Sequence, residues 1–230
     1  TDSVESLKEE SETLRKGLIQ IRSGRIAVFA GEILGQSAIE PMSSRDDVEG
    51  VFQELRRQAE YVVGARTGLS PEEIVLAVDL EKEMEAIDGC AGQANRKFVR
   101  ILALANAIFG EDIRIDYEVK ESFLVYRKGE VLFRQSVDRD SASYDPESEL
   151  HLMLRLVNRK AIQDSIVPDP VTGKVGALDA TDFYEAVDIL QKSGGRVNVE
   201  VSAAEDIYTE GPVRITLSIR PEDGEIQRED

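Results

Sequence analysis

The chain has little of the chemistry that most metal and redox sites use. Its 230 residues include one cysteine, one histidine and no tryptophan. A single cysteine excludes an intrachain disulfide and favours a reducing compartment, so we expect a cytoplasmic protein. Zinc sites take several ligands from histidine and cysteine, and Cys90 and His151 alone do not supply them. We therefore expect no bound metal and no cofactor.

Basic residues are also scarce. The 28 lysines and arginines stand against 45 aspartates and glutamates, which gives a net charge of −17. Phosphate backbones and anionic membranes are bound mainly through clustered basic residues, so neither direct nucleic-acid binding nor membrane binding is expected. Hydrophobic residues make up 41% of the chain, which is enough for a packed core. No apolar run approaches the roughly 20 residues that span a bilayer.

The N-terminal segment 3–22 has the spacing of an amphipathic helix. Its apolar residues recur at three- and four-residue intervals and also fit barely three heptads. These residues are Val4, Leu7, Leu14, Leu18 and Ile21. Two interpretations stay open: a helix packed on its own domain, or a short coiled coil that binds a partner or a second copy.

The pattern up to residue 110 predicts a helical bundle. Helices are expected over 44–63, which opens with a capping arrangement, and over 70–87, which opens with Ser-Pro-Glu-Glu. Segment 93–109 is apolar on nearly every side, which predicts the buried central helix of the bundle. Segment 24–39 fits either a strand or a helix, and we favour the helix.

Beyond Gly110 the spacing changes to the alternation of strands. We expect an antiparallel meander over 112–137, helices from about 146 and 179, and a second strand pair over 196–220. The resulting prediction is an α+β fold: a helical region (1–110), then an α+β region (111–220) packed on it, with a mainly antiparallel sheet of about five strands and two inserted helices. Residues 221–230 are expected to be a disordered acidic tail, and no repeat of the roughly 20–50-residue solenoid kind is visible.

Candidate ligand sites fail on their spacing. The loop 168–174 contains a Gly-Lys pair, but Pro168 stands where a phosphate-binding loop needs its first glycine. A possible calcium loop over 138–149 lacks the turn glycine. Glu81, Glu83 and Glu85 cannot converge on one ion if they lie on a helix, because residues two apart point in different directions.

The most suggestive charged group is Arg155, Arg159 and Lys160, placed on one expected helix. Such a group can contact an anion or an acidic partner, or it can neutralise neighbouring carboxylates. His151, among leucines and without a nucleophile motif nearby, is expected to lie at the surface.

Because no catalytic constellation is complete, the sequence favours a non-catalytic interaction or assembly subunit, which binds a protein partner or forms a homo-oligomer. Two alternatives stay open. One is an enzyme with a carboxylate- or Lys-based site for a small polar or cationic substrate. The other is an acidic mimic of nucleic acid.

The 3–22 segment generates the first prediction. Replacing Leu14 and Leu18 with asparagine should weaken any interface they centre, because each buried aliphatic side chain contributes roughly 1.5–3 kcal/mol. Light scattering of wild type and double variant measures this. A monomeric wild type, and no partner that loses affinity in the variant, would assign the helix to its own domain instead.

Overall fold

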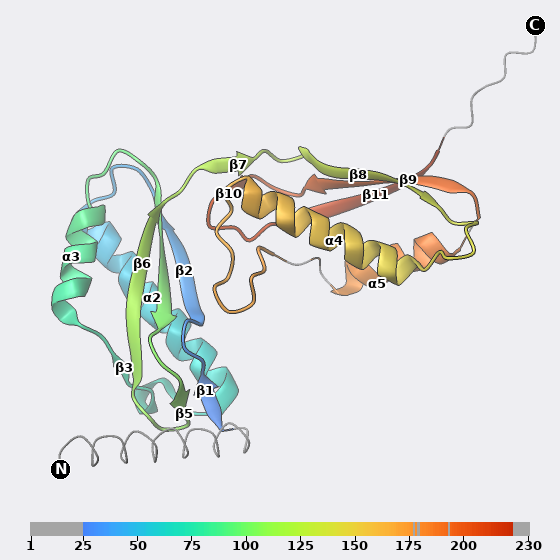
Figure 1. Ribbon diagram of the computed structural model, residues 1–230. Coiled ribbons are helices and arrows are strands. Elements are labelled where there is room, and N and C mark those ends of the chain that lie inside the picture. The colour runs from blue at the N-terminus through green and yellow to red at the C-terminus, as the bar shows by residue number, and fades with distance from the viewer. Residues whose placement is uncertain (1–24, 177, 179, 193, 223–230) are drawn as a thin grey trace, which may run out of the picture. The chain divides into compact units, whose positions relative to one another are not determined.

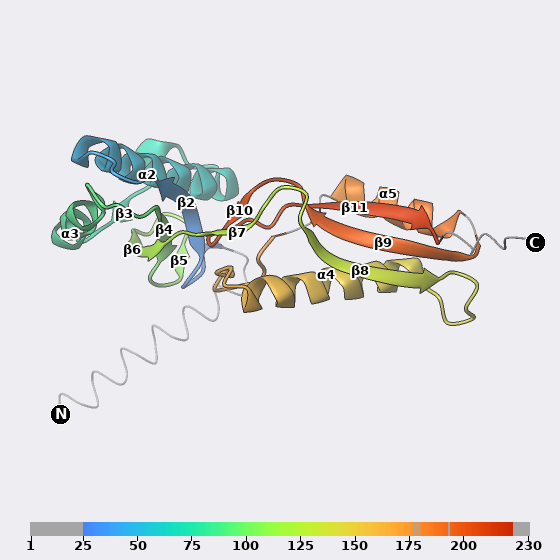
Figure 2. The same cartoon turned by 90° about the horizontal axis from the view of Figure 1, so that it is seen from above.

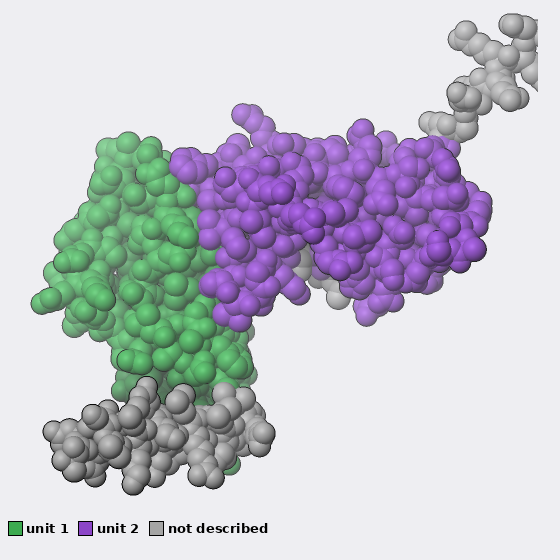
Figure 3. Space-filling model, viewed as in Figure 1, with its two compact units in different colours: residues 1–121 green, residues 122–230 purple. Residues whose placement is uncertain are grey.

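The computed structural model describes residues 25–176, 178, 180–192 and 194–222. The chain divides into two compact units, unit 1 (residues 1–121) and unit 2 (residues 122–230) (Figure 3). The expected 3–22 helix, and all of the expected acidic tail beyond residue 222, lie outside the described residues.

Unit 1 is a sheet with two helices on one face (Figure 1). Its elements are β1 (Ile26–Val28), β2 (Ile33–Ile39), α2 (Arg45–Thr67), the 3-10 turn η1 (Pro71–Glu73), β3 (Leu76–Ala77), α3 (Leu80–Cys90), β4 (Lys97–Ala103), β5 (Ala107–Ile108) and β6 (Ile113–Glu121). The sheet order is β2-β4-β6-β3, with β3 parallel to β6 and the other pairs antiparallel. The short strands β1 and β5 pair separately.

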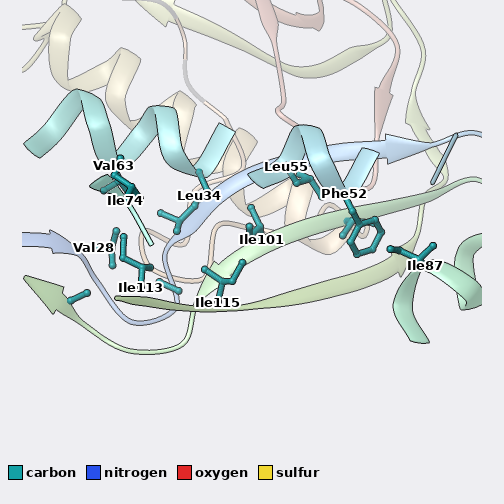
Figure 4. Close-up of a cluster of buried hydrophobic side chains, with 14 of the residues drawn as sticks. Val28, Leu34, Phe52, Leu55, Val63, Ile74, Ile87, Ile101, Ile113 and Ile115 are labelled. Carbon is teal, nitrogen blue, oxygen red and sulfur yellow. The ribbon is translucent and has the colours of Figure 1, made fainter. Parts of the chain in front are cut away.

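The core of unit 1 lies between α2 and the sheet (Figure 4). Helix α2 begins at a capping box, in which Ser44 and Asp47 satisfy each other's backbone amides. The helix buries Phe52 and Leu55, and the central strand β4 contributes Ile101 to the same core. Burying side chains of this size stabilises the fold by roughly 1.5–3 kcal/mol each.

Unit 2 has a three-stranded antiparallel sheet, and both of its helices lie on the same face (Figures 1 and 2). Its elements are β7 (Leu124–Tyr126), β8 (Val131–Asp138), α4 (Pro146–Gln163), α5 (Ala180–Gln191), β9 (Arg196–Ala203), β10 (Ile207–Tyr208) and β11 (Ile215–Pro221). The sheet order is β11-β9-β8, and the short strands β7 and β10 pair separately.

The two units repeat one architecture. Each runs from a short strand to a long strand, then through two helices to the central strand, a second short strand and a last long strand. In each, the first long strand pairs with the central strand, and the central strand pairs with the last. The short strands pair with each other in both units, with a register shift in both. The chain is therefore an internal structural duplication with a period of about a hundred residues, far longer than a solenoid repeat.

The same hydrogen bonds hold the turn before the first long strand in both units. In unit 1 the Gly31 amide donates to the Ala103 carbonyl at 2.8 Å, and the Ala30 amide donates to Asn106 Oδ1 at 2.8 Å. The Phe29 amide donates to Glu32 Oε2 at 3.0 Å. We call this arrangement the clasp.

Unit 2 reproduces the clasp bond for bond. The Gly129 amide donates to the Ala203 carbonyl at 2.8 Å, and the Lys128 amide donates to Asp206 Oδ1 at 2.8 Å. The Arg127 amide donates to Glu130 Oε2 at 3.0 Å. Gly31 and Gly129 have φ values of 79° and 84°, a backbone region that disfavours side chains with a Cβ.

The predicted N-terminal helical bundle is wrong. Within the described residues the protein is mostly sheet, with 11 strands in four sheets and only four α-helices, which are not gathered in residues 1–110. Segment 93–109 forms β4 and β5 instead of a central helix. Residues on both faces of β4, such as Phe98 and Val99, are buried, so the strand does not alternate between apolar and polar residues and resembles a buried helix in sequence.

Three smaller expectations also fail. Segment 24–39 forms β1 and β2, because the chain turns at Gly31 instead of continuing as a helix. The Ser70 start yields only the η1 turn, and α3 begins at its own N-cap, Asp79. The expected meander does not form, since β6 pairs with β4, β7 with β10 and β8 with β9. The helices expected from 44, 146 and 179 are confirmed as α2, α4 and α5.

The clasp generates the second prediction. Asp206→Ala should destabilise the chain by about 1 kcal/mol, because the Lys128 amide loses its acceptor. Asp206→Asn should cost much less, since Asn106 fills the equivalent place in unit 1 with the same Oδ1 geometry. Urea denaturation followed by circular dichroism measures both. Equal losses in the two variants would mean that the charge, not the acceptor oxygen, matters.

Candidate functional site

Unit 1 holds a polar cluster of three side chains between its helices and its sheet. Arg56 of α2 donates from Nε to Glu83 of α3 at 3.1 Å and makes a second contact with that carboxylate through Nη2. The hydroxyl of Tyr117 on β6 donates to Glu83 Oε2 at 2.6 Å. These three residues, which we call the triad, tie α2, α3 and β6 together.

Electrostatics fixes the protonation of the triad. Glu83 is only 8% exposed, and burial opposes its ionisation more than any other single influence. The hydrogen bonds from Arg56 and Tyr117, together with the attraction of the Arg56 charge, outweigh burial, so the pKa of Glu83 lies below its ordinary value. Burial and the neighbouring carboxylate raise the pKa of Tyr117. At neutral pH the triad is therefore an ionised carboxylate held by a cation and a neutral phenol.

The duplication shows what stands in these places in unit 2. The helices are matched by five buried positions, each 98 residues apart. Val48, Phe52, Leu55, Ala59 and Val63 of α2 correspond to Pro146, Leu150, Met153, Val157 and Ala161 of α4. Helices α3 and α5 begin 100 residues apart, at Leu80 and Ala180. Strands β6 and β11 correspond at the same spacing, because Ile115 pairs with Ala103 and Ile215 pairs with Ala203.

These correspondences replace the triad with apolar side chains. Leu154, Phe183 and Leu217 occupy the positions of Arg56, Glu83 and Tyr117. All three of these side chains are half-buried. The two helices of unit 2 thus lack the ion pair that joins the helices of unit 1.

The segment before the second helix also packs on the core in unit 1 but not in unit 2. Val75 and Val175 are equivalent, because their carbonyls accept the same hydrogen bond in the two units. The Ile113 amide donates to the Val75 carbonyl at 2.9 Å, and the Val213 amide donates to the Val175 carbonyl at 2.8 Å. The flanking Ile74 and Leu76 pack on the core of unit 1. Their equivalents are Lys174, which is exposed, and Gly176, which has no side chain, so neither fills core space. A Cβ on Gly176 would lie 2.3 Å from the Val213 carbonyl oxygen, so no side chain fits there.

The result is an open cleft in unit 2 where unit 1 is filled. The cleft has a volume of about 550 Å³ and lies between α4, the loop 172–176, the start of α5 and β11. Its apolar lining includes Leu154, Val157, Phe183 and Ile215. The His151 ring lies 4.8 Å from the Phe183 ring, measured between centroids, and forms part of the wall.

The loop wall of the cleft is held in place by α4. Asn158 Nδ2 donates to the Gly173 carbonyl at 3.3 Å, and the Val175 amide donates to Asn158 Oδ1 at 3.0 Å. Asp169 Oδ1 accepts the amides of Val171 and Thr172, each at 2.9 Å. A wall fixed by this many bonds needs little ordering when a ligand binds.

The cleft carries basic groups at its rim. Arg155 and Lys174 line it, both are exposed, and neither forms an ion pair with another described residue. Glu147 is the acidic residue of the lining, and it lies 3.7 Å from His151. The cleft therefore combines an apolar floor with two exposed cations and one carboxylate.

The basic group predicted from sequence is divided by the structure. Arg155 lines the cleft, and Arg159 is exposed one helical turn further along α4. Lys160 faces elsewhere: its Nζ lies 2.6 Å from Asp164 Oδ2, and that carboxylate also accepts the Tyr126 hydroxyl at 2.6 Å. The Lys160 contact is the main reason that the pKa of Asp164 is lowered.

The other predicted site residues have varied outcomes. The interaction residues Val4 to Ile21 lie outside the described part of the chain, so they stay a prediction. Glu81 and Glu85 are exposed while Glu83 is buried, as helical spacing requires. Within residues 25–222, apart from the undescribed positions 177, 179 and 193, no three His, Cys, Asp or Glu side chains gather as a metal site. Among the described helices, none has both the length and the apolar composition to cross a bilayer.

Sequence reasoning missed the triad and the cleft. Both are assembled from residues far apart in the chain, and no local spacing marks them. A signal did exist in the repeated Gly-Glu-Ile-Leu at 31–34 and Gly-Glu-Val-Leu at 129–132, with Ile-Arg-Ile at 113–115 and Val-Arg-Ile at 213–215. Aligning the chain on these would have paired Glu83 with Phe183 and Leu76 with Gly176.

Comparisons with known proteins give a family likeness without a function. Residues 126–228 match the family described as the DUF3084-associated C-terminal helical hairpin. The helices α4 and α5 fall in this range, together with the strands of the unit 2 sheet. An uncharacterized protein of Nostoc sp. (strain PCC 7120) is 25% identical over 202 residues, which cover 86% of this chain and 39% of that protein. This chain thus spans about two fifths of the length of that relative. No solved structure matches this chain.

The triad generates the third prediction. Arg56→Leu should destabilise the chain by about 2 kcal/mol at neutral pH, because it leaves the Glu83 carboxylate buried without its cation. The triple change Arg56→Leu, Glu83→Phe and Tyr117→Leu installs the residues of unit 2 and should recover most of that loss. Urea denaturation of both variants provides the comparison.

The pH dependence supplies the control. Because the pKa of Glu83 is lowered in the folded state, its stabilisation is present above the unfolded pKa of about 4.3 and is lost as the pH falls through the folded value. The gap between wild type and Arg56→Leu should therefore narrow below about pH 4. A triple variant less stable than Arg56→Leu would refute the equivalence of the two sets of positions.

Proposed function

We propose that this chain is a non-catalytic interaction subunit and that unit 2 holds part of a protein partner in its cleft. The observation that carries the proposal is the contrast between the units. One architecture is closed by the triad, Ile74 and Leu76 in unit 1, and left open in unit 2.

The lining of the cleft supports a binding role. Leu154, Val157 and Ile215 line a hollow of about 550 Å³, a size usual for ligand sites. Apolar surface of this kind gains free energy when a partner removes it from water. Ala59 and Ile115, the unit 1 equivalents of Val157 and Ile215, are buried in the core of that unit.

The triad favours a structural role over the carboxylate-based enzyme considered from the sequence. A general base works best with a pKa near the operating pH. The pKa of Glu83 is shifted down and that of Tyr117 up, away from neutrality on both sides. Their hydrogen bonds are directed at each other and at Arg56, which leaves them to hold the helices together.

A cytoplasmic location is part of the same proposal. It rests on the single cysteine of the chain, Cys90, which is a buried free thiol. Burial raises the pKa of this thiol, which makes it less reactive. Self-association through the 3–22 segment stays a separate prediction within the proposal.

A matched pair of variants tests the proposed function. Arg155→Glu with Lys174→Glu reverses the charge of the cleft, whereas Arg57→Glu makes the same change at the position of unit 1 equivalent to Arg155. Arg57 is exposed and pairs with Glu54 at 3.1 Å. We expect wild type and Arg57→Glu to retain a stoichiometric partner from native lysate, and the cleft variant to lose it. Quantitative mass spectrometry of the retained proteins provides the measurement.

Thermal unfolding of each variant checks that the fold is intact. The proposal fails if the same partner is retained by all three proteins, or if no stoichiometric partner is retained by the wild type.

A further inference from the structure

We infer that the cleft of unit 2 accepts an acidic peptide segment that carries an aromatic or aliphatic side chain, the apolar side chain entering the cavity and the carboxylates meeting its basic rim. This inference rests on the proposed function and names the chemistry of the partner.

The charges of the cleft select for a negative ligand. Several cations of unit 2 form ion pairs outside the cleft lining. Examples are Arg134 with Glu200 and Lys192 with Asp188. Arg155 and Lys174 line the cleft, are exposed and form no ion pair with a described residue, and Glu147, beside His151, is the one carboxylate of the lining. In a chain with 17 more acidic than basic residues, two exposed cations against one carboxylate at a cleft favour an anion as its ligand.

The floor of the cleft selects for an apolar group. Phe183, Leu154 and Ile215 line it, and the His151 ring packs against Phe183. The cavity has room for one large side chain, and aromatic rings gain from edge and offset contacts with Phe183. A ligand with carboxylates alone would leave this surface wet.

The surface around the cavity favours a peptide over a small molecule. Tyr184, which lines the cleft, is 69% exposed, and Val171, beside the lining residue Thr172, is 51% exposed. Apolar surface therefore continues past the cavity on the helix side and on the loop side. A peptide segment can cover both places, whereas a molecule confined to the cavity covers neither.

The single histidine makes the site observable. His151 is the one histidine of the chain and forms part of the cleft wall, so its Cε1 proton gives a single assignable nuclear magnetic resonance signal in untagged protein. The experiment selects binders to the full chain from a library of random dodecapeptides. The strongest peptide is then synthesised and titrated while the His151 signal is followed.

We expect the selected peptides to be enriched in aspartate and glutamate around an aromatic or aliphatic residue, and to shift the His151 signal. Arg155→Glu with Lys174→Glu should weaken binding about tenfold or more, whereas Arg57→Glu should leave it within about twofold. Replacing the apolar residue of the peptide with serine should also weaken binding about tenfold. Lys174→Ile, which takes the residue of unit 1, keeps the fold testable if charge reversal disturbs the loop.

Several results would overturn the inference. These are selected peptides that are basic or neutral, no enrichment at all, or binding that leaves the His151 signal and the cleft variants unaffected. Phenylacetate acting at lower concentration than the peptide would identify a small-anion site. A His151 signal that changes on dilution of the chain alone would identify a second copy as the occupant. If these tests fail while a native partner still depends on Arg155 and Lys174, the proposed function stands and only the peptide chemistry is wrong.

Discussion

Each unit depends on how one tight turn satisfies its backbone amides. The turn before the first long strand exposes amides that no sheet partner reaches, and an unpaired amide away from water costs free energy. Glu32 and Asn106 accept them in unit 1, and Glu130 and Asp206 do so in unit 2. The second acceptor comes from beyond the central strand, so the clasp fixes the register of the first strand against the centre of the sheet.

That register determines where the helices and the last strand lie. The Leu104 amide donates to the Arg114 carbonyl at 2.8 Å, and the Ala204 amide donates to the Arg214 carbonyl at 2.9 Å. These bonds align the last strand with the central strand, to which the clasp holds the first strand. Once the three long strands are aligned, the apolar faces of the helices have one place to pack. Side chains between the helices can then change without loss of the architecture. This is why unit 1 can have the triad where unit 2 has Leu154, Phe183 and Leu217.

The sequence predicted those elements whose signals are local. Ser44 and Asp47 mark the start of α2, and the stripe that includes Phe52 and Leu55 marks its buried face. Strand β4 was missed because a strand buried on both faces loses its alternation and reads as a helix. The duplication was missed because its period exceeds the range of solenoid repeats, although Gly31-Glu32 and Gly129-Glu130 carried the signal.

The cleft lies beyond local prediction for a different reason. His151 was expected at the surface and the 168–174 loop was set aside as a failed phosphate loop, and each judgement considered one segment alone. What makes the cleft is the replacement of two apolar core side chains, which becomes visible only when Lys174 and Gly176 are compared with Ile74 and Leu76. The lack of an apolar side chain at a position leaves no motif in the sequence, so only comparison with a second copy of the same architecture reveals it.

The duplication also gives the charges of the cleft their meaning. Arg57 and Arg155 occupy equivalent positions, and in unit 1 the arginine pairs with Glu54 on its own helix. The residue equivalent to Glu54 is Leu152, which cannot accept a hydrogen bond. Unit 2 has therefore lost the acidic neighbour while it kept the cation. The exchange of the triad for Leu154, Phe183 and Leu217 removes one cation and one carboxylate, so it adds apolar surface without changing the net charge. The positive charge of the cleft therefore comes from Arg155 and from Lys174, which stands where unit 1 has Ile74.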